Sequence, residues 1–127
     1  MGKTVAIVDD DPSYSATMKD FLDSQGVSSW RASDGSQFES FARGNAPDLI
    51  IIDMQMPGGG GPALVKIIKG QDALKNLPII FISSMPVDKM QGWFQDISPV
   101  RYLSKPPDLT VLTTYLQELL PGWKARP

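Results

Sequence analysis

The sequence predicts an α/β fold in which a doubly wound, five-stranded parallel sheet carries helices on both faces. Short apolar runs rich in β-branched residues alternate five times with stretches of helical periodicity. Acidic, hydroxyl or basic residues directly follow most of these runs. The chain has 127 residues, 42% of them hydrophobic and 20% charged, which suits one domain with a sizeable core. We therefore expect a single domain over residues 1–127.

The first expected strand covers residues 4–8, a run of four apolar residues after Thr4. Pro12 can open a helix over about residues 13–25, and Gly26 suits its C-terminal stop. We interpret Asp11 as the N-cap of this helix, because Pro12 follows it directly. The apolar face of the helix consists of Tyr14, Met18, Phe21 and Leu22.

A second strand is expected at residues 27–32, although two serines weaken its pattern. Ser33 or Asp34 can cap a short helix that ends at Gly44. The third strand, residues 49–52, is the uninterrupted run Leu-Ile-Ile-Ile. A continuous apolar run of this kind is typical of a strand that is buried on both faces.

The second half of the chain continues the alternation. A glycine-rich loop over residues 56–61 precedes a helix with Pro62 in its first turn. Residues 78–82 form the fourth expected strand, and a weak helix is expected over about residues 87–96. The fifth strand covers residues 100–103.

The last expected helix is amphipathic. Asp108 can cap it, and leucines at helical spacing continue to Leu120. Pro121-Gly122 then ends it. This alternation of strands and helices indicates a parallel sheet with helices on both faces.

Composition excludes several classes of function. A net charge of −2 gives no argument for direct nucleic-acid binding. The chain has no long apolar span and no signal-peptide pattern, so we expect a cytoplasmic protein without a membrane segment. The absence of histidine and cysteine excludes a Ser-His-Asp triad, a histidine zinc site, a disulfide and a phosphohistidine on this chain.

Polar side chains cluster at the carboxyl ends of the expected strands, which meet at one edge of a parallel sheet. These residues are Asp9, Asp10, Asp53, Ser83, Ser84 and Lys105. Two carboxylates about 5 Å apart repel each other by about 3 kcal/mol at an effective dielectric near 20. A hard cation such as Mg²⁺ would relieve this repulsion, and a lysine and a serine can bind phosphoryl oxygens.

Four segments carry a close resemblance to a known family. They are Val8-Asp9-Asp10, Asp53-Met54-Gln55-Met56-Pro57, Ile82-Ser83-Ser84 and Tyr102-Leu103-Ser104-Lys105-Pro106. In this order and spacing the chain resembles the receiver domain of two-component response regulators, of the chemotaxis-regulator type. The resemblance covers essentially the whole chain and implies a flavodoxin-like (βα)5 fold with strand order 2-1-3-4-5.

The resemblance implies a role for each carboxylate. Asp53 would be the nucleophile that accepts a phosphoryl group from a partner kinase's phosphohistidine. Asp10, Asp53 and the backbone carbonyl of Gln55 would bind Mg²⁺, with Asp9 helping through water. The domain would act as a signalling module and not as an enzyme.

The remaining roles also follow from the resemblance. Lys105 would neutralise phosphoryl charge, and its bond to Pro106 would be cis. Ser83 would hydrogen-bond the phosphoryl group and shift inward when it arrives. Tyr102 would be the switch aromatic that moves from an exposed to a buried position, while Ser84 would only need to be small.

The implied partners are a sensor histidine kinase or a phosphotransfer protein, and an output protein or domain. The output would bind the face formed by the fourth helix, fifth strand and fifth helix, and a phosphorylation-dependent homodimer is an alternative. Pro107 stands where the family commonly has an aromatic residue, which leaves the choice of partner open.

Three other functions are alternatives for this sequence. A haloacid-dehalogenase phosphatase needs a second Asp two residues after the nucleophile, where this chain has Gln55. A flavodoxin-type phosphate loop is contradicted by Asp9-Asp10-Asp11, which would repel the phosphate. A receiver-like scaffold that is never phosphorylated is disfavoured by the intact set of site residues.

Overall fold

This computed structural model describes residues 2–54, 60–91 and 99–125. Within these residues the sheet contains five parallel strands in the order β2-β1-β3-β4-β5. The strands are β1 Thr4–Val8, β2 Ser28–Ala32, β3 Leu49–Asp53, β4 Ile79–Ser83 and β5 Val100–Ser104. Each adjacent pair is parallel, so the carboxyl ends of all five strands face the same edge. The predicted fold class and strand order are therefore confirmed.

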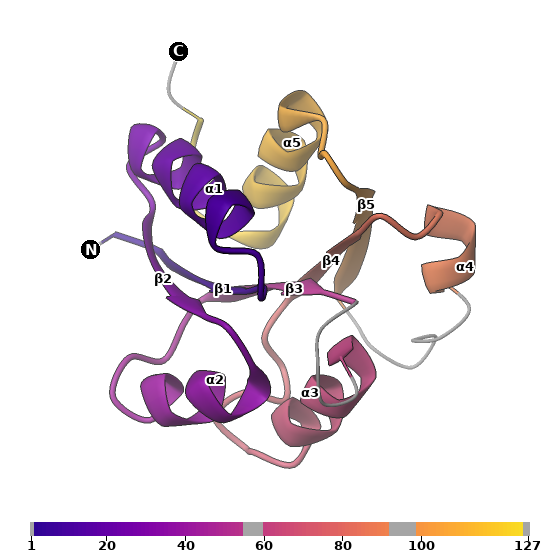
Figure 1. Cartoon of the computed structure of the whole chain (residues 1–127). Coiled ribbons are helices and arrows are strands. Elements are labelled where there is room, and N and C mark those ends of the chain that lie inside the picture. Colours follow the sequence, from indigo (N-terminus) through magenta and orange to yellow (C-terminus); the bar gives the residue numbers. More distant parts are fainter. Residues whose placement is uncertain (1, 55–59, 92–98, 126–127) are drawn as a thin grey trace.

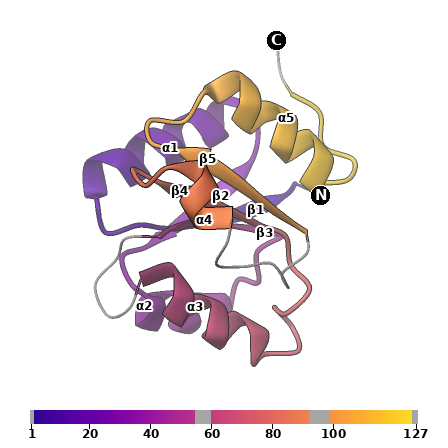
Figure 2. The ribbon, with the colours of Figure 1, turned by 90° about the vertical axis from the view of Figure 1, so that its right-hand side faces the viewer.

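The described residues form five helices, which are α1 Pro12–Ser24, α2 Gly35–Ala42, α3 Gly60–Lys69, α4 Val87–Gln91 and α5 Leu109–Leu119. Four of them cover the two faces of the sheet, and α4 lies beside the edge formed by β4 and β5 (Figure 1). Figures 1 and 2 show α1 and α5 on one face of the sheet and α2 and α3 on the other. No described helix is long and apolar enough to span a lipid bilayer.

The central strand β3 divides its side chains between two hydrophobic cores. Ile50 and Ile52 belong to the core beneath α2 and α3. Leu49 and Ile51 belong to the core beneath α1 and α5. All four are at most 2% exposed, and burying one such side chain stabilises the fold by about 1.5–3 kcal/mol. This burial on both faces explains the uninterrupted apolar run.

Most element ends lie within one residue of their predicted positions, but α3 does not. Helix α3 begins at Gly60, so Pro62 lies in its first turn as predicted, but Gly60 and Gly61 belong to the helix and not to the preceding loop. Gly61 packs closely on the end of β3: a Cβ at this position would lie 3.0 Å from Sδ and 3.3 Å from Cα of Met54. A side chain at this position would therefore require Met54 to move by a few tenths of an ångström, which glycine avoids.

The helix caps follow the prediction. The Asp11 side chain accepts a hydrogen bond from the Tyr14 N–H, and Asp108 caps α5 in the same way through Thr110. Gly26 adopts a φ of 75° just after α1, a conformation that favours glycine. Of the weak helix expected over residues 87–96, the part at Val87–Gln91 is helical, and residues 92–98 lie outside the described chain.

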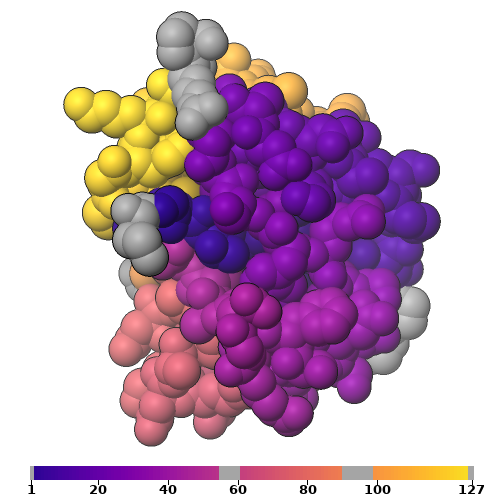
Figure 3. Space-filling view, turned by 90° about the vertical axis from the view of Figure 1, so that its left-hand side faces the viewer, coloured from indigo at the N-terminus to yellow at the C-terminus, as the bar shows by residue number. Residues whose placement is uncertain are grey.

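The two ends of the described chain lie side by side. In Figure 3 the indigo N-terminal segment touches the yellow C-terminal segment. Gly2, Lys3 and Trp123 line one shallow pocket there, and the Trp123 indole N–H donates to the Gln25 carbonyl oxygen at 3.1 Å. Gly2 and Lys3 directly precede β1, so this end of the molecule is the amino edge of the parallel sheet, opposite to its carboxyl edge.

Candidate functional site

Three carboxylates meet where β1 and β3 end. Asp9 and Asp10 directly follow β1, and Asp53 is the last residue of β3. One carboxylate oxygen from each residue lies within 4.8 Å of the other two. Asp9 and Asp53 are buried, at 5% and 6% exposure, whereas Asp10 is exposed. The structure therefore brings together the acidic residues that the sequence placed at one edge.

Lys105 lies between the two buried carboxylates. Its Nζ is 2.9 Å from Oδ2 of Asp9 and 3.2 Å from Oδ2 of Asp53. The backbone N–H of Lys105 donates to the Ser83 carbonyl oxygen at 2.8 Å, which fixes the start of the side chain beside β4. The bond from Lys105 to Pro106 is cis, as the resemblance implies.

The electrostatics of this group leave uncompensated negative charge. Burial raises the pKa of Asp9, and the hydrogen bonds from Lys105 and from the Asp11 N–H offset this only in part. Burial lowers the pKa of Lys105, but its hydrogen bond and charge interactions with Asp9 and Asp53 outweigh burial and raise it. One ammonium is shared by two buried carboxylates, so it does not fully neutralise the charge of either one.

The donor set fits a hard divalent cation. If all three carboxyl groups are counted as anions, they and the one ammonium have a formal charge of −2 together. Carboxylate oxygens at this spacing are the ligands that Mg²⁺ prefers in proteins. Gln55, whose carbonyl the resemblance implies as a further ligand, lies outside the described residues, so its part in the site remains a prediction.

Ser83 is the buried member of the serine pair. It ends β4, is 0% exposed, and its Oγ accepts a hydrogen bond from the Met85 N–H at 3.2 Å. Asp53 pairs in register with Ile82, so Ser83 is one position further along the strand next to Asp53. Ser84 is exposed, and the resemblance implies only that this residue is small.

Tyr102 is half-buried on β5. Its ring stacks on that of Phe81, its register partner on β4, with centroids 5.7 Å apart and planes 21° apart. Both residues belong to the core on the side of α2 and α3. Burial raises the pKa of the Tyr102 phenol. Tyr102 thus occupies a position between exposed and buried in this structure.

Tyr14 joins the site, although its sequence pattern indicated only a core position. The Lys105 Nζ lies over the Tyr14 ring, 4.2 Å from the centroid. Burial, followed by the charges of Asp9 and Asp53, raises the pKa of the Tyr14 phenol. The phenol therefore stays protonated at neutral pH. Helical spacing correctly placed Tyr14 on the inner face of α1, but nothing in the sequence indicated that Lys105 would cover it.

Comparison with protein-family models decides the family. Residues 5–117 match the model described as the response regulator receiver domain. The chain belongs to this family. It is thus a receiver domain of the two-component signalling type, as its motifs predicted.

Named relatives agree with this assignment. The receiver domain is 28% identical to the polar-differentiation response regulator DivK of Brucella anthropi over 106 residues, which cover 84% of this chain and 86% of DivK. DivK of Brucella ovis is 27% identical with the same coverage.

Solved structures share the fold of this receiver domain. The chemotaxis protein CheY4 of Vibrio cholerae is 26% identical with a TM-score of 0.86, covering 94% of this chain and 100% of that one. The signal receiver domain of a signal transduction histidine kinase from Syntrophus aciditrophicus is 29% identical with a TM-score of 0.80, covering 94% and 90%.

Proposed function

We propose that this receiver domain accepts a phosphoryl group on Asp53 from a phosphohistidine of a sensor kinase or phosphotransfer protein. A carboxylate oxygen of Asp53 would form a bond to phosphorus while the phosphorus–nitrogen bond breaks, and the histidine nitrogen would keep the electron pair. The product is an acyl phosphate on Asp53. The observation that supports this most is the buried Asp53 carboxylate beside the Lys105 ammonium at 3.2 Å.

Mg²⁺ is the proposed cofactor. Asp9, Asp10 and Asp53, together with the Gln55 carbonyl, would hold it, and when bound it supplies positive charge opposite the phosphoryl oxygens. Phosphoryl transfer depends on positioning and charge neutralisation more than on covalent machinery. The excess negative charge of the cluster supports this assignment.

Lys105 and Ser83 would act on the transferred group itself. The Lys105 ammonium would exchange its contact with Asp53 for a phosphoryl oxygen. The Ser83 Oγ accepts from the Met85 N–H, and a serine hydroxyl also carries a donor, with which Ser83 would bind another phosphoryl oxygen.

The output would follow from a shift of Ser83 towards the phosphoryl group. Phe81 and Ser83 share β4, and Phe81 stacks on Tyr102, so movement at the end of β4 would favour a more buried Tyr102. The surface formed by α4, β5 and α5 would then bind an output protein or domain, or a second copy of the chain. We place this signalling function in the cytoplasm, without steady turnover of a substrate.

The test is incubation with acetyl phosphate and Mg²⁺, followed by intact mass spectrometry. The wild type should gain one phosphoryl group, and Asp53→Asn should gain none. Asp11→Asn is the matched control, because Asp11 is an exposed cap in the same acidic triplet and asparagine also caps helices. The proposal fails if the wild type gains nothing or if Asp53→Asn keeps the adduct.

A further inference from the structure

The Tyr14 ring forms one wall around the Lys105 ammonium. The ring centroid lies 4.2 Å from Nζ, while Asp9 and Asp53 contact the same nitrogen at 2.9 and 3.2 Å. The Lys105 side chain is only 19% exposed. A cation at this distance from an aromatic face is attracted by the electron-rich ring.

The backbone of α1 holds the ring in place. The Tyr14 N–H donates to Oδ1 of the cap residue Asp11 at 3.1 Å, so Tyr14 sits in the first turn directly after Asp9 and Asp10. Its ring packs against the core between α1 and α5. Tyr14 also lines a groove shared with Pro106 and Pro107, the two residues after Lys105. The ring therefore contacts the site from a fixed helix.

The hydroxyl group of Tyr14 has no visible part in this arrangement. It is buried and has no hydrogen-bond partner within the described part of the chain. Whatever Tyr14 contributes must come from its ring, and phenylalanine should supply the same contact.

We propose that Tyr14 is a positioning residue whose ring holds the Lys105 ammonium beside Asp53. The proposal rests on the phosphoryl transfer proposed above, in which Lys105 neutralises phosphoryl charge. A lysine side chain has a flexible four-carbon stem that must be ordered before its ammonium can act. The ring restricts that stem and excludes water from one side of the ammonium. The Lys105 side chain therefore loses less conformational entropy when the transition state forms.

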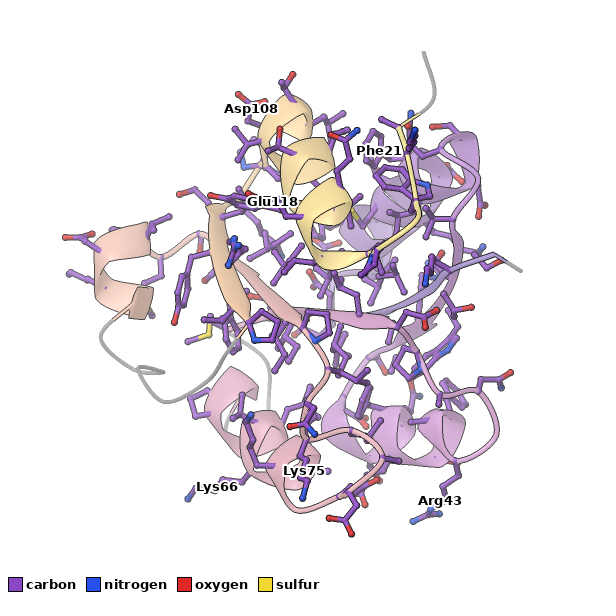
Figure 4. The ribbon with its side chains drawn as sticks, turned by 180° about the vertical axis from the view of Figure 1, so that it is seen from behind. Phe21, Arg43, Lys66, Lys75, Asp108 and Glu118 are labelled. Carbon is purple, nitrogen blue, oxygen red and sulfur yellow. The ribbon has the colours of Figure 1, made fainter. Side chains whose placement is uncertain are left out.

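Variants of two aromatic residues on α1 test the proposal. Tyr14→Leu should lower the rate constant for phosphorylation by acetyl phosphate about three- to tenfold, the range expected for loss of one cation–π contact. Tyr14→Phe should stay within about twofold of the wild type. Phe21→Leu is the matched control, because Phe21, labelled in Figure 4, is seven residues after Tyr14 on α1 and lines the same groove.

A spectroscopic measurement detects the contact independently of activity. In the NMR spectrum of the wild type, the ε-methylene protons of Lys105 should be shifted upfield by the ring current of Tyr14. The shift should persist in Tyr14→Phe and disappear in Tyr14→Leu. This test applies to the wild type even if Tyr14→Leu does not fold.

The outcomes separate this inference from the proposed function. A wild-type rate in folded Tyr14→Leu, with Asp53 still labelled, overturns the role of Tyr14 alone. So does an equal loss in Tyr14→Phe and Tyr14→Leu, or the absence of an upfield shift in the wild type. Failure of the wild type to label Asp53 would instead refute the proposed function.

Discussion

Lys105 Nζ lies 2.9 Å from Oδ2 of Asp9, although the two residues follow strands β5 and β1, which are separated by two other strands. Strand spacing places the axes of β1 and β5 about 14 Å apart. The lysine side chain therefore extends across the carboxyl edge of the sheet and contacts Asp53 on the way. The ammonium links strands that share no backbone hydrogen bonds, so the site depends on the sheet order as a whole.

Magnesium should stabilise the wild type. Ligand linkage predicts a gain of about 1.4 kcal/mol at ten times the dissociation constant. Asp10→Asn should remove most of this gain and also relieve repulsion in the metal-free protein. Thermal unfolding with and without MgCl₂ measures both effects, and Asp11→Asn should respond as the wild type does. An unchanged magnesium response in Asp10→Asn would argue against Asp10 as a ligand.

Removing the ammonium should impair both stability and phosphorylation. Lys105→Met leaves two buried carboxylates without their cation, which should lower the free energy of unfolding by about 2 kcal/mol without metal. Loss of this charge should slow phosphorylation by acetyl phosphate by roughly a hundredfold.

Lys75→Met is the control for that variant. Lys75 forms an exposed ion pair with Asp72 between α3 and β4, far from the carboxyl edge (Figure 4). Its loss should change the free energy of unfolding by at most about 0.5 kcal/mol in urea titrations. Equal rates for Lys105→Met and the wild type would exclude a role for the ammonium in transfer.

The stability of the metal-free protein should depend on pH through Asp9. Burial raises the pKa of this carboxyl in the folded state, so its contribution to stability is fully present below the unfolded-state pKa. That contribution is lost as the pH rises through the folded-state pKa. Asp9→Asn does not titrate, so it should be more stable than the wild type near neutral pH, and the difference should shrink on acidification.

Urea unfolding in EDTA at a series of pH values, from about 7 down to about 4, measures this difference. A difference that widens on acidification would contradict this prediction. It would mean that the ion pair with Lys105 lowers the folded-state pKa of Asp9 by more than burial raises it.

Ser83 should couple Asp53 to Tyr102. Ser83→Ala should still accept the phosphoryl group on Asp53, because the acceptor and Lys105 are intact. It should lose the change in Tyr102 environment that phosphorylation produces in the wild type, measured by NMR of fluorine-labelled tyrosine. Ser84→Ala, at the exposed neighbouring position, should retain that change. A wild-type Tyr102 response in Ser83→Ala would show that coupling follows another route.

Local patterns predicted the strands and the acidic edge because both depend on residues close in sequence. The run from Leu49 to Ile52 could only be buried on both faces, and Asp53 then had to lie where β3 ends. The caps at Asp11 and Asp108 were equally local, since each side chain reaches N–H groups two or three residues ahead.

Features that depend on tertiary contacts were not predictable in this way. The close approach of Gly61 to Met54, in the first turn of α3, is a contact that no spacing rule reveals. The position of Tyr14 against Lys105 joins residues that are far apart in sequence, and helical spacing explains only why Tyr14 faces inward. The hydrogen bond from the Met85 N–H to the Ser83 Oγ likewise could not be predicted from the sequence.

Locating the phosphoryl group is the most direct test of phosphorylation at Asp53. After treatment with acetyl phosphate and Mg²⁺, borohydride reduces an aspartyl phosphate to homoserine, and peptide mass spectrometry identifies the converted residue. We predict conversion at Asp53, dependent on acetyl phosphate and absent from Asp53→Asn. Conversion at Asp9 or Asp10, or no conversion at any residue, would contradict the account.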